Sequence, residues 1–199
     1  VYLHAMVRDE KGEKMSKTKG NVIDPLDVSS KYGADALRFT LASMAGQGRD
    51  IKLSMKRVEG YKAFANKLWN ATRFALMNLK DYDAPEAAKA TPNAPDRWIL
   101  ARARTVVAEA TAALEGYHFA DYASAVYQFV WGDLCDWYIE LSKSALYGDD
   151  LNAKRAAQHA LVTSLDTALR LLHPAMPFVT EELWQKLPAS VRPTKTICV

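Results

Sequence analysis

Glycines and prolines divide most of this chain into long segments with a helical pattern, and this division limits its possible folds more than any other feature. Four such segments run at 55–79, 97–116, 119–147 and 151–172. Short or proline-rich connections join them, so segments adjacent in sequence are expected to lie antiparallel in space. The sequence therefore predicts a mainly α protein built as an antiparallel helical bundle.

The first long segment shows the pattern in detail. Ser54 is expected to be its N-cap, because a serine hydroxyl can accept a hydrogen bond from a free backbone N–H of the first turn. Apolar residues then recur at spacings of three and four, which places them on one helical face. The positions expected on that buried face are Val58, Tyr61, Ala65, Leu68, Trp69, Thr72 (through its methyl group) and Leu76.

Local breaks set the remaining boundaries. Residues 81–95 contain three prolines and are expected to form a linker, after which Asp96 is the expected N-cap of the next helix and Gly116 its end. Gly148 is expected to begin a turn into the fourth long helix. The stretch HPAMPF should end that helix, because each proline disfavours helix at the residue before it. A short last helix is expected at 179–187, with Thr180 near its start.

The first 50 residues follow a different pattern. Residues 1–7 are expected to form a buried strand, and 8–24 mostly loop, with Gly12 able to take a positive φ. Pro25 is well placed in the first turn of a short helix to about Tyr32, and Gly33 separates that helix from a second one at 34–44. The stretch AGQGRD then suggests a division into 1–50 and 51–199.

Composition excludes several classes of protein. The chain has 199 residues and is 49% hydrophobic, enough to bury a sizeable core. No apolar run reaches the roughly 18 to 20 residues of a membrane span, so a soluble, cytoplasmic protein is expected. Cys135 and Cys198 lack ligand-like spacing, so neither a disulfide nor a metal site is expected. The apolar start at Val1 suggests a piece of a longer protein.

Charge is distributed unevenly along the chain. The formal net charge is +3 overall, but residues 52–80 carry 7 basic and 1 acidic side chains. The positions in this basic stretch that can form a stripe are Lys56, Lys67, Asn70, Arg73 and Phe74. Basic residues beside an aromatic ring are typical of surfaces that bind single-stranded RNA loops. The alternative is that Phe74 belongs to the core and the charged residues are ordinary surface.

A second candidate site is the loop GEKMSKTKG. Lys14, Lys17 and Lys19 offer ammonium groups, Ser16 and Thr18 offer hydroxyls, and Met15 is the single apolar residue. Such a loop suits a polyphosphate, since its charges can stabilise spread negative charge. On composition alone a solvated lysine-rich turn is the favoured interpretation, because runs of charge are usually ordinary surface.

The order of the residues favours the first interpretation. KMSKTKGNVIDPLDVSSKYGADALRF resembles the KMSKS signature of class I aminoacyl-tRNA synthetases and the segment that follows it in the branched-chain subgroup. The resemblance continues through FANKLWNATRF, DRWILAR, CDWYIELSK and LHPAMPFVTEELWQ, and so covers essentially the whole chain. Within the subgroup it is greatest to the valyl-tRNA synthetases, with an isoleucyl enzyme as the alternative. A stand-alone RNA-binding helical module is the alternative from another class.

The resemblance implies an enzyme that activates valine with ATP, with Mg²⁺ expected on the phosphates, and transfers it to tRNA(Val). It implies that 1–50 are the end of a Rossmann catalytic domain, a short α/β remnant, and that 51–199 are an anticodon-binding bundle. Lys14 and Lys17 would stabilise the departing pyrophosphate, and Met15, Ser16 and Thr18 would complete the ATP-binding loop. The basic stripe would contact the anticodon. The expected state is a monomer.

One departure from the family limits the expected activity. A His-x-Gly-His signature should hold ATP from the other side, and His4, His118, His159 and His173 do not form it. No room remains for an editing domain, which a hydrophobic valine pocket needs in order to reject threonine. The isolated chain is therefore expected to be inactive and to hold no ATP stably.

Other conspicuous residues are assigned to structure. The residues Trp131, Cys135, Trp137 and Tyr138 are expected in an aromatic helix core. His173 is expected at a helix end, and the pair Glu181 and Glu182 near the start of the last helix, where the helix dipole favours acids.

Overall fold

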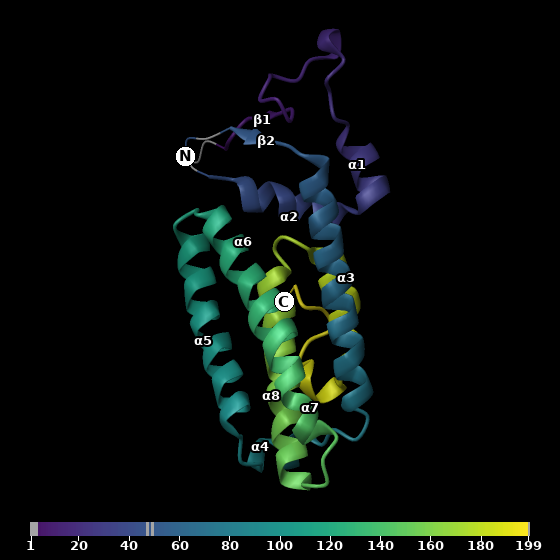
Figure 1. Ribbon diagram of the computed structural model, residues 1–199, viewed down its shortest axis with the longest axis vertical. Coiled ribbons are helices and arrows are strands. Elements are labelled where there is room, and N and C mark those ends of the chain that lie inside the picture. Colours follow the sequence, from purple (N-terminus) through teal and green to yellow (C-terminus); the bar gives the residue numbers. More distant parts are fainter. Residues whose placement is uncertain (1–3, 47, 49, 199) are drawn as a thin grey trace.

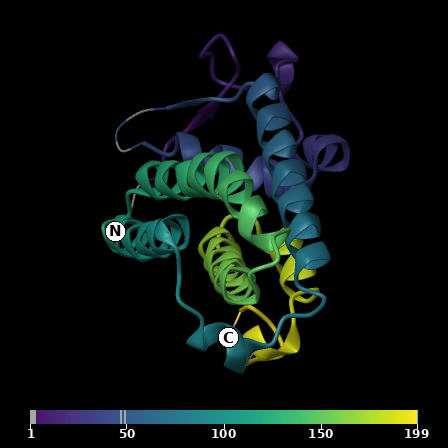
Figure 2. The ribbon, with the colours of Figure 1, turned by 60° about the horizontal axis from the view of Figure 1, so that its bottom comes forward.

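The computed structural model, which describes residues 4–46, 48 and 50–198, consists of long helices along one axis with a smaller cap across one end (Figure 1). The long elements are α3 (Met55–Asn78), α5 (Ala94–Glu115), α6 (Phe119–Gln128), η2 (Phe129–Tyr138), α7 (Ile139–Leu146) and α8 (Leu151–Leu172). Along the chain, α3, α5, the continuous stretch α6–η2–α7 and α8 alternate in direction, and the tilted view shows them packed beside one another (Figure 2). The predicted antiparallel bundle is confirmed.

The segment expected as one helix at 119–147 is continuous but not uniform. Between α6 and α7, residues Phe129–Tyr138 form a π-helix, whose turns are wider than those of an α-helix. Its buried residues are Phe129, Val130, Leu134 and Tyr138. The changed period decides which aromatic side chains of this segment face inward, and periodicity alone did not predict it.

The cap holds the short α/β part. It contains β1 (Val7–Arg8), η1 (Lys17–Lys19), α1 (Pro25–Tyr32), α2 (Ala34–Met44) and β2 (Ile51–Lys52). The two strands are parallel, with Val7 opposite Ile51. The strand expected at 1–7 is therefore confined, in the described part, to Val7–Arg8, because pairing with β2 ends after two residues; residues 1–3 lie outside the described part.

Two of the expected local features of the cap are confirmed. Gly12 has a φ of +86°, and a Cβ there would lie 2.9 Å from Cε of Lys52. The backbone conformation therefore favours glycine, whereas the flexible end of Lys52 could move aside for a Cβ. Gly33 has a φ of +94° and separates α1 from α2 where the sequence predicted a break.

Several helix ends differ from the prediction. The N-cap of α5 is Asn93, and Asp96 forms the other half of a capping box. The expected linker contains a helix, α4 (Ala84–Lys89), whose first turn includes Pro85, a residue that is well accepted there. The last helix, α9 (Pro177–Trp184), begins at a proline, two residues earlier than expected, and ends sooner. A short η3 (Ala189–Val191) follows.

Two hydrophobic clusters hold these elements together. The larger fills the bundle, and the smaller lies in the cap around Val28, Ala36, Leu53 and Val58. Phe39 of α2 is fully buried in the larger cluster, while Val58 of α3 is fully buried in the smaller one. Each part therefore contributes a side chain to the hydrophobic cluster of the other.

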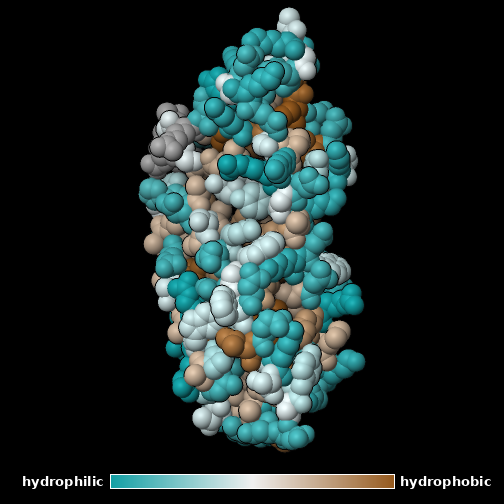
Figure 3. All heavy atoms as spheres, viewed as in Figure 1, coloured by the Kyte–Doolittle hydropathy of each residue, from teal (hydrophilic) through white to brown (hydrophobic). Residues whose placement is uncertain are grey.

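Two tryptophans expected in the core are exposed. The buried face of α3 centres on Phe64, Leu68, Ala71 and Ala75, which turns Trp69 outward with 42% of its surface exposed. Trp137 is 63% exposed, whereas Tyr138 beside it is completely buried. Hydrophilic residues cover much of the face in Figure 3, above all at the cap end. Within the described residues, none of the helices is both long and apolar enough to span a membrane.

Candidate functional site

The lysine loop has a defined local structure. Oγ of Ser16 accepts a hydrogen bond from the backbone N–H of Lys19 at 3.2 Å, which begins the short helix η1. The side chain of Asn21 accepts from the backbone N–H of Ser16 at 2.9 Å and donates to Asp9 at 2.9 Å. Gly20 ends the turn with a φ of +67°. Ser16 and Asn21 thus shape the loop from within.

The lysine loop is hydrogen-bonded to the carboxylate of Asp9. Hydrogen bonds from the Asn21 side chain and from the backbone of Glu13 hold the pKa of Asp9 below its ordinary value. The carboxylate therefore stays charged at neutral pH and keeps Asn21 in place.

The three lysines of the loop differ in their surroundings. Lys19 pairs with Glu13 at 3.2 Å. Lys14 and Lys17 are exposed, and within the described part of the chain neither forms an ion pair. Met15 packs against the small cluster of the cap and anchors the loop. This arrangement leaves two ammonium groups of the same loop accessible to an anion.

A hollow of about 420 Å³ beside the loop does not suit a phosphate. Its charged lining consists of three acids, Asp9, Glu10 and Glu13, and two lysines, Lys11 and Lys19, so the acids outnumber the bases and disfavour an anion. A phosphate is accordingly expected on the exposed lysines rather than in this hollow.

The residues of the predicted stripe on α3 fall into two groups. Lys67 forms an ion pair with Asp136 and lies 3.8 Å from the ring centre of Trp131, so its charge is already compensated. Phe74 is half-buried against the bundle core, with the ammonium of Lys143 6.0 Å from its ring centre. These two residues lie on the flank that faces η2 and α7.

The other members of the stripe are exposed. Lys56, Asn70 and Arg73 are all on the surface, and no ion pair is formed by Lys56 or Arg73 among the described residues. Trp69 is next to them and provides an exposed ring that sequence reasoning placed in the core. The spacing of Asn66, Trp69 and Arg73, by three and four, is the signal that places them on one outer face.

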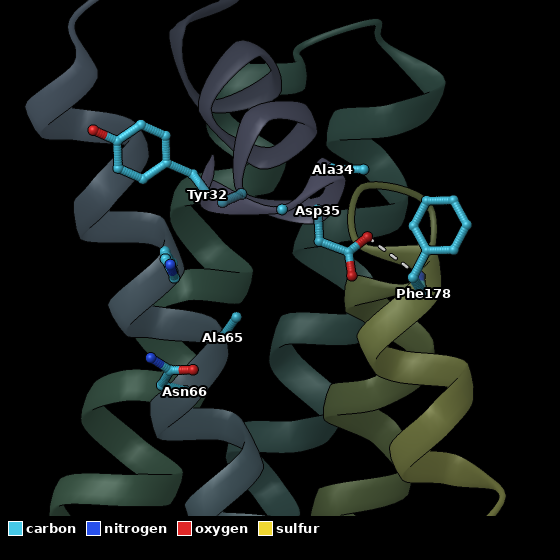
Figure 4. A pocket seen from close by; sticks show the side chains of 9 residues that line it. Tyr32, Ala34, Asp35, Ala65, Asn66 and Phe178 are labelled. Atoms are coloured by element: carbon cyan, nitrogen blue, oxygen red, sulfur yellow. Dashed lines mark hydrogen bonds between the residues drawn. The ribbon is translucent and has the colours of Figure 1, made fainter. Parts of the chain in front are cut away.

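A hollow of about 450 Å³ lies where α1, α2, α3 and α9 meet (Figure 4). Lys62 and Asn66 of α3 contribute an ammonium and an amide, and the ring of Phe178 is 66% exposed. The rings of Tyr32 and Phe178 lie on opposite sides of the view, with the Asp35 carboxylate turned toward the backbone of Phe178 (Figure 4). Cationic, amide and aromatic groups of this kind contact single-stranded nucleic acids.

Two family profiles match the chain. The family described as anticodon-binding domain of tRNA ligase matches residues 96–198. The family described as tRNA synthetases class I (I, L, M and V) matches residues 1–54. The first match covers the larger part of the bundle, and the second covers the cap with its lysine loop.

Curated relatives match this chain over nearly its whole length. A valine--tRNA ligase of Syntrophotalea carbinolica is 57% identical over 199 residues, which are 99% of this chain and 22% of that protein. A valine--tRNA ligase of Thermotoga maritima is 55% identical over 190 residues, which are 96% of this chain and 21% of that protein. The chain thus spans about a fifth of the length of the curated relatives it matches.

Solved structures share the fold. A ternary complex described as LeuRS-tRNA-LeuAMS, from Agrobacterium radiobacter K84, matches 93% of this chain and 22% of its own, with a TM-score of 0.75 and 25% identity. A methionyl-tRNA synthetase of Mycobacterium tuberculosis in complex with methionyl-adenylate matches 91% of this chain and 36% of its own, with a TM-score of 0.71 and 22% identity. The second likeness concerns the fold alone.

Proposed function

The chain belongs to the family of tRNA ligases that carry this anticodon-binding domain, and from that membership we propose that it is part of a valine--tRNA ligase. The proposed enzyme activates valine with ATP and transfers it to tRNA(Val). The chain would supply the ATP-phosphate loop and the anticodon-binding bundle. The observation that carries the proposal is 57% identity to a valine--tRNA ligase over 99% of this chain, cap and bundle included.

In the first step, Lys14 and Lys17 are the residues proposed to act on ATP. As the α-phosphorus is attacked, negative charge builds on the departing pyrophosphate, and two uncompensated ammonium groups can stabilise it. Ser16 shapes the turn, Met15 anchors it, and Thr18 adds a hydroxyl. Mg²⁺ would accompany ATP as a counterion of its phosphates. Lys19 is left out of this role because Glu13 compensates it.

In the second step, the outer face of α3 is proposed to contact the tRNA anticodon. Lys56 and Arg73 would meet phosphates, and Asn70 would read a base edge. Lys67 and Phe74 remain in the proposed surface, but their contacts with Asp136 and with the core make them weaker contributors than Arg73. We add Trp69 as the ring on which a base can stack.

We also propose the division of the chain into 1–50 and 51–199. The matched ranges 1–54 and 96–198 support it, although Val58 and Phe39 pack across the junction. The proposed location is the cytoplasm, where translation requires such an enzyme.

The proposed tRNA surface is tested with a single exposed arginine. Removing Arg73 should weaken binding of a valine tRNA anticodon stem-loop and lower the slope of log affinity against log salt by about 0.7 to 0.9, the contribution of one phosphate contact. Titration of the labelled stem-loop with wild type and Arg73→Ala at several salt concentrations measures both. The matched control is Arg104→Ala, an exposed arginine on α5, which should leave affinity and slope unchanged.

Two outcomes would contradict this assignment. If Arg73→Ala and Arg104→Ala bind equally well, the outer face of α3 is not the tRNA surface. If the wild-type chain shows no affinity for the stem-loop even at low salt, the bundle lacks the proposed role.

A further inference from the structure

Three metal-binding side chains meet where α8, α9 and the C-terminal segment come together. His173 lies at the end of α8, Glu181 in α9, and Cys198 in the segment that follows η3. One nitrogen, one carboxylate oxygen and the sulfur all lie within 4.8 Å of one another. The residues are well separated in sequence, so their spacing resembles no metal motif.

Thr180 holds the His173 ring in position through a hydrogen bond to its Nδ1. Oγ1 of the buried Thr180 is 2.8 Å from the backbone oxygen of Met176 and 2.7 Å from Nδ1 of His173. With the hydroxyl proton donated to the carbonyl of Met176, Nδ1 of His173 donates to Oγ1 and the lone pair is on Nε2, the tautomer that a metal ligand needs. That nitrogen lies 2.8 Å from Sγ of Cys198.

The carboxylate of Glu181 is held in place by three donors. Oε1 accepts from the Gln185 side chain at 2.7 Å, and Oε2 accepts from Oγ1 of Thr196 at 2.9 Å and from the backbone N–H of Ile197 at 3.1 Å. A carboxylate has about four lone-pair sites, so Oε1 keeps one for a further partner. The same contacts hold the residue before Cys198 and so position the cysteine.

We propose that His173, Glu181 and Cys198 bind a divalent cation of the Zn²⁺ class, with water as a fourth ligand. Imidazole nitrogen and thiolate sulfur select borderline and soft metals over Mg²⁺ or Ca²⁺, and a carboxylate completes a common zinc set. Thr180 holds the other ring nitrogen of His173, as partners of metal-bound histidines do.

The geometry requires a small adjustment. Zn–N and Zn–S bonds of about 2.0 and 2.3 Å place tetrahedral N and S atoms about 3.5 Å apart. The two atoms therefore have to separate from 2.8 Å, which the exposed Cys198 can do by rotating its side chain. The cation would fasten the C-terminal segment to the junction of α8 and α9.

The test is metal titration of the 199-residue chain, with Zn²⁺ followed by calorimetry and Co²⁺ by absorption. One tightly bound ion per chain is expected, with a thiolate-to-Co²⁺ charge-transfer band. Cys198→Ala should lose that band and lower Zn²⁺ affinity at least tenfold, and Thr180→Val should lower it 10- to 100-fold. Cys135→Ala is the matched control, because burial raises the pKa of the Cys135 thiol to about 11 and keeps it protonated.

Because Cys198 is exposed, its alanine variant should fold like the wild type, which circular dichroism checks. If wild type and Cys198→Ala bind Zn²⁺ equally, or if bound Co²⁺ shows no thiolate band, the proposal is wrong. The tRNA assay is independent of this outcome.

Discussion

The buried side chain of Asp96 connects two helical elements of the bundle. Its side chain is completely buried, accepts a hydrogen bond from the Asn93 backbone at 3.1 Å, and accepts another from the hydroxyl of Tyr138 at 2.8 Å. Burial raises the pKa of Asp96 above its ordinary value of 3.8, against the hydrogen bonds of Tyr138 and Asn93, which lower it. The residue thus joins α5 to η2 while its ionisation is disfavoured.

The raised pKa gives a prediction about stability and pH. The folded chain holds the Asp96 proton to higher pH than the unfolded chain, so the stabilising contribution is complete below pH 3.8 and is lost as pH rises through the folded pKa. Asp96→Asn cannot ionise. Its oxygen can accept from Asn93 and its NH₂ can donate to Tyr138, whose proton can turn to the backbone oxygen of Ala157 at 3.2 Å.

Urea unfolding from pH 3.8 upward, across the acid range to neutrality, measures this effect. We expect Asp96→Asn to match or exceed the wild-type free energy of unfolding at neutral pH and to lose the decrease in this window. Asp96→Ala should cost about 2 kcal/mol, since it removes half of a capping box and a buried acceptor. If the free energy of unfolding of the wild type rises through this pH window while that of Asp96→Asn does not, the assignment is wrong.

Among the elements, α2 joins the cap to the bundle, and its contact with α9 is made by hydrogen bonds at both ends of a short segment. The carboxylate of Asp35 in α2 accepts hydrogen bonds from the backbone N–H groups of Phe178 and Val179 at 3.2 and 2.7 Å. Arg38, one turn later, donates to the backbone oxygens of Pro174 and Ala175 at 2.9 and 3.2 Å. One helix therefore satisfies both the first N–H groups of α9 and the carbonyls that precede it.

We expect Asp35→Ala to lower the free energy of unfolding by about 1 to 3 kcal/mol, because it leaves two N–H groups at a part-buried helix start without their acceptor. Thermal or urea unfolding measures the change. The matched control is Asp27→Ala, an exposed acid in the first turn of α1, which should cost only a few tenths of a kcal/mol. Equal losses in both variants would show that the α2–α9 contact contributes little.

The whole chain is expected to lack the activity of the proposed enzyme. It spans about a fifth of its curated relatives, and its four histidines do not form the family's second ATP signature. The purified chain should therefore give no valine-dependent ATP–pyrophosphate exchange, while a full-length valine--tRNA ligase gives it in the same assay. Exchange above background by the 199-residue chain would show that the lysine loop does not need a partner signature.

The sequence by itself determined where the long helices lie and several of their ends. The starts of α1 and α2 follow from Pro25 and Gly33, because a cap or break acts within one turn and needs no distant partner. The family likewise follows from the order of residues around Lys14 and Lys17, which does not depend on how the chain packs. Local rules were wrong where two signals competed, as at Asn93 and Asp96, which share one capping box.

Only the tertiary structure decided which surface each helix presents and which distant groups meet. The spacing of apolar residues shows that a helix has a buried face, but it does not fix how the helix is rotated relative to its neighbours. Trp69 was therefore expected inside and lies outside. Packing of α3 against η2 pairs Lys67 with Asp136 and removes it as a free cation. The return of the C-terminal segment over α9 brings Cys198 to His173 and Glu181. Such contacts depend on how whole helices pack, which the spacing of residues along one segment does not contain.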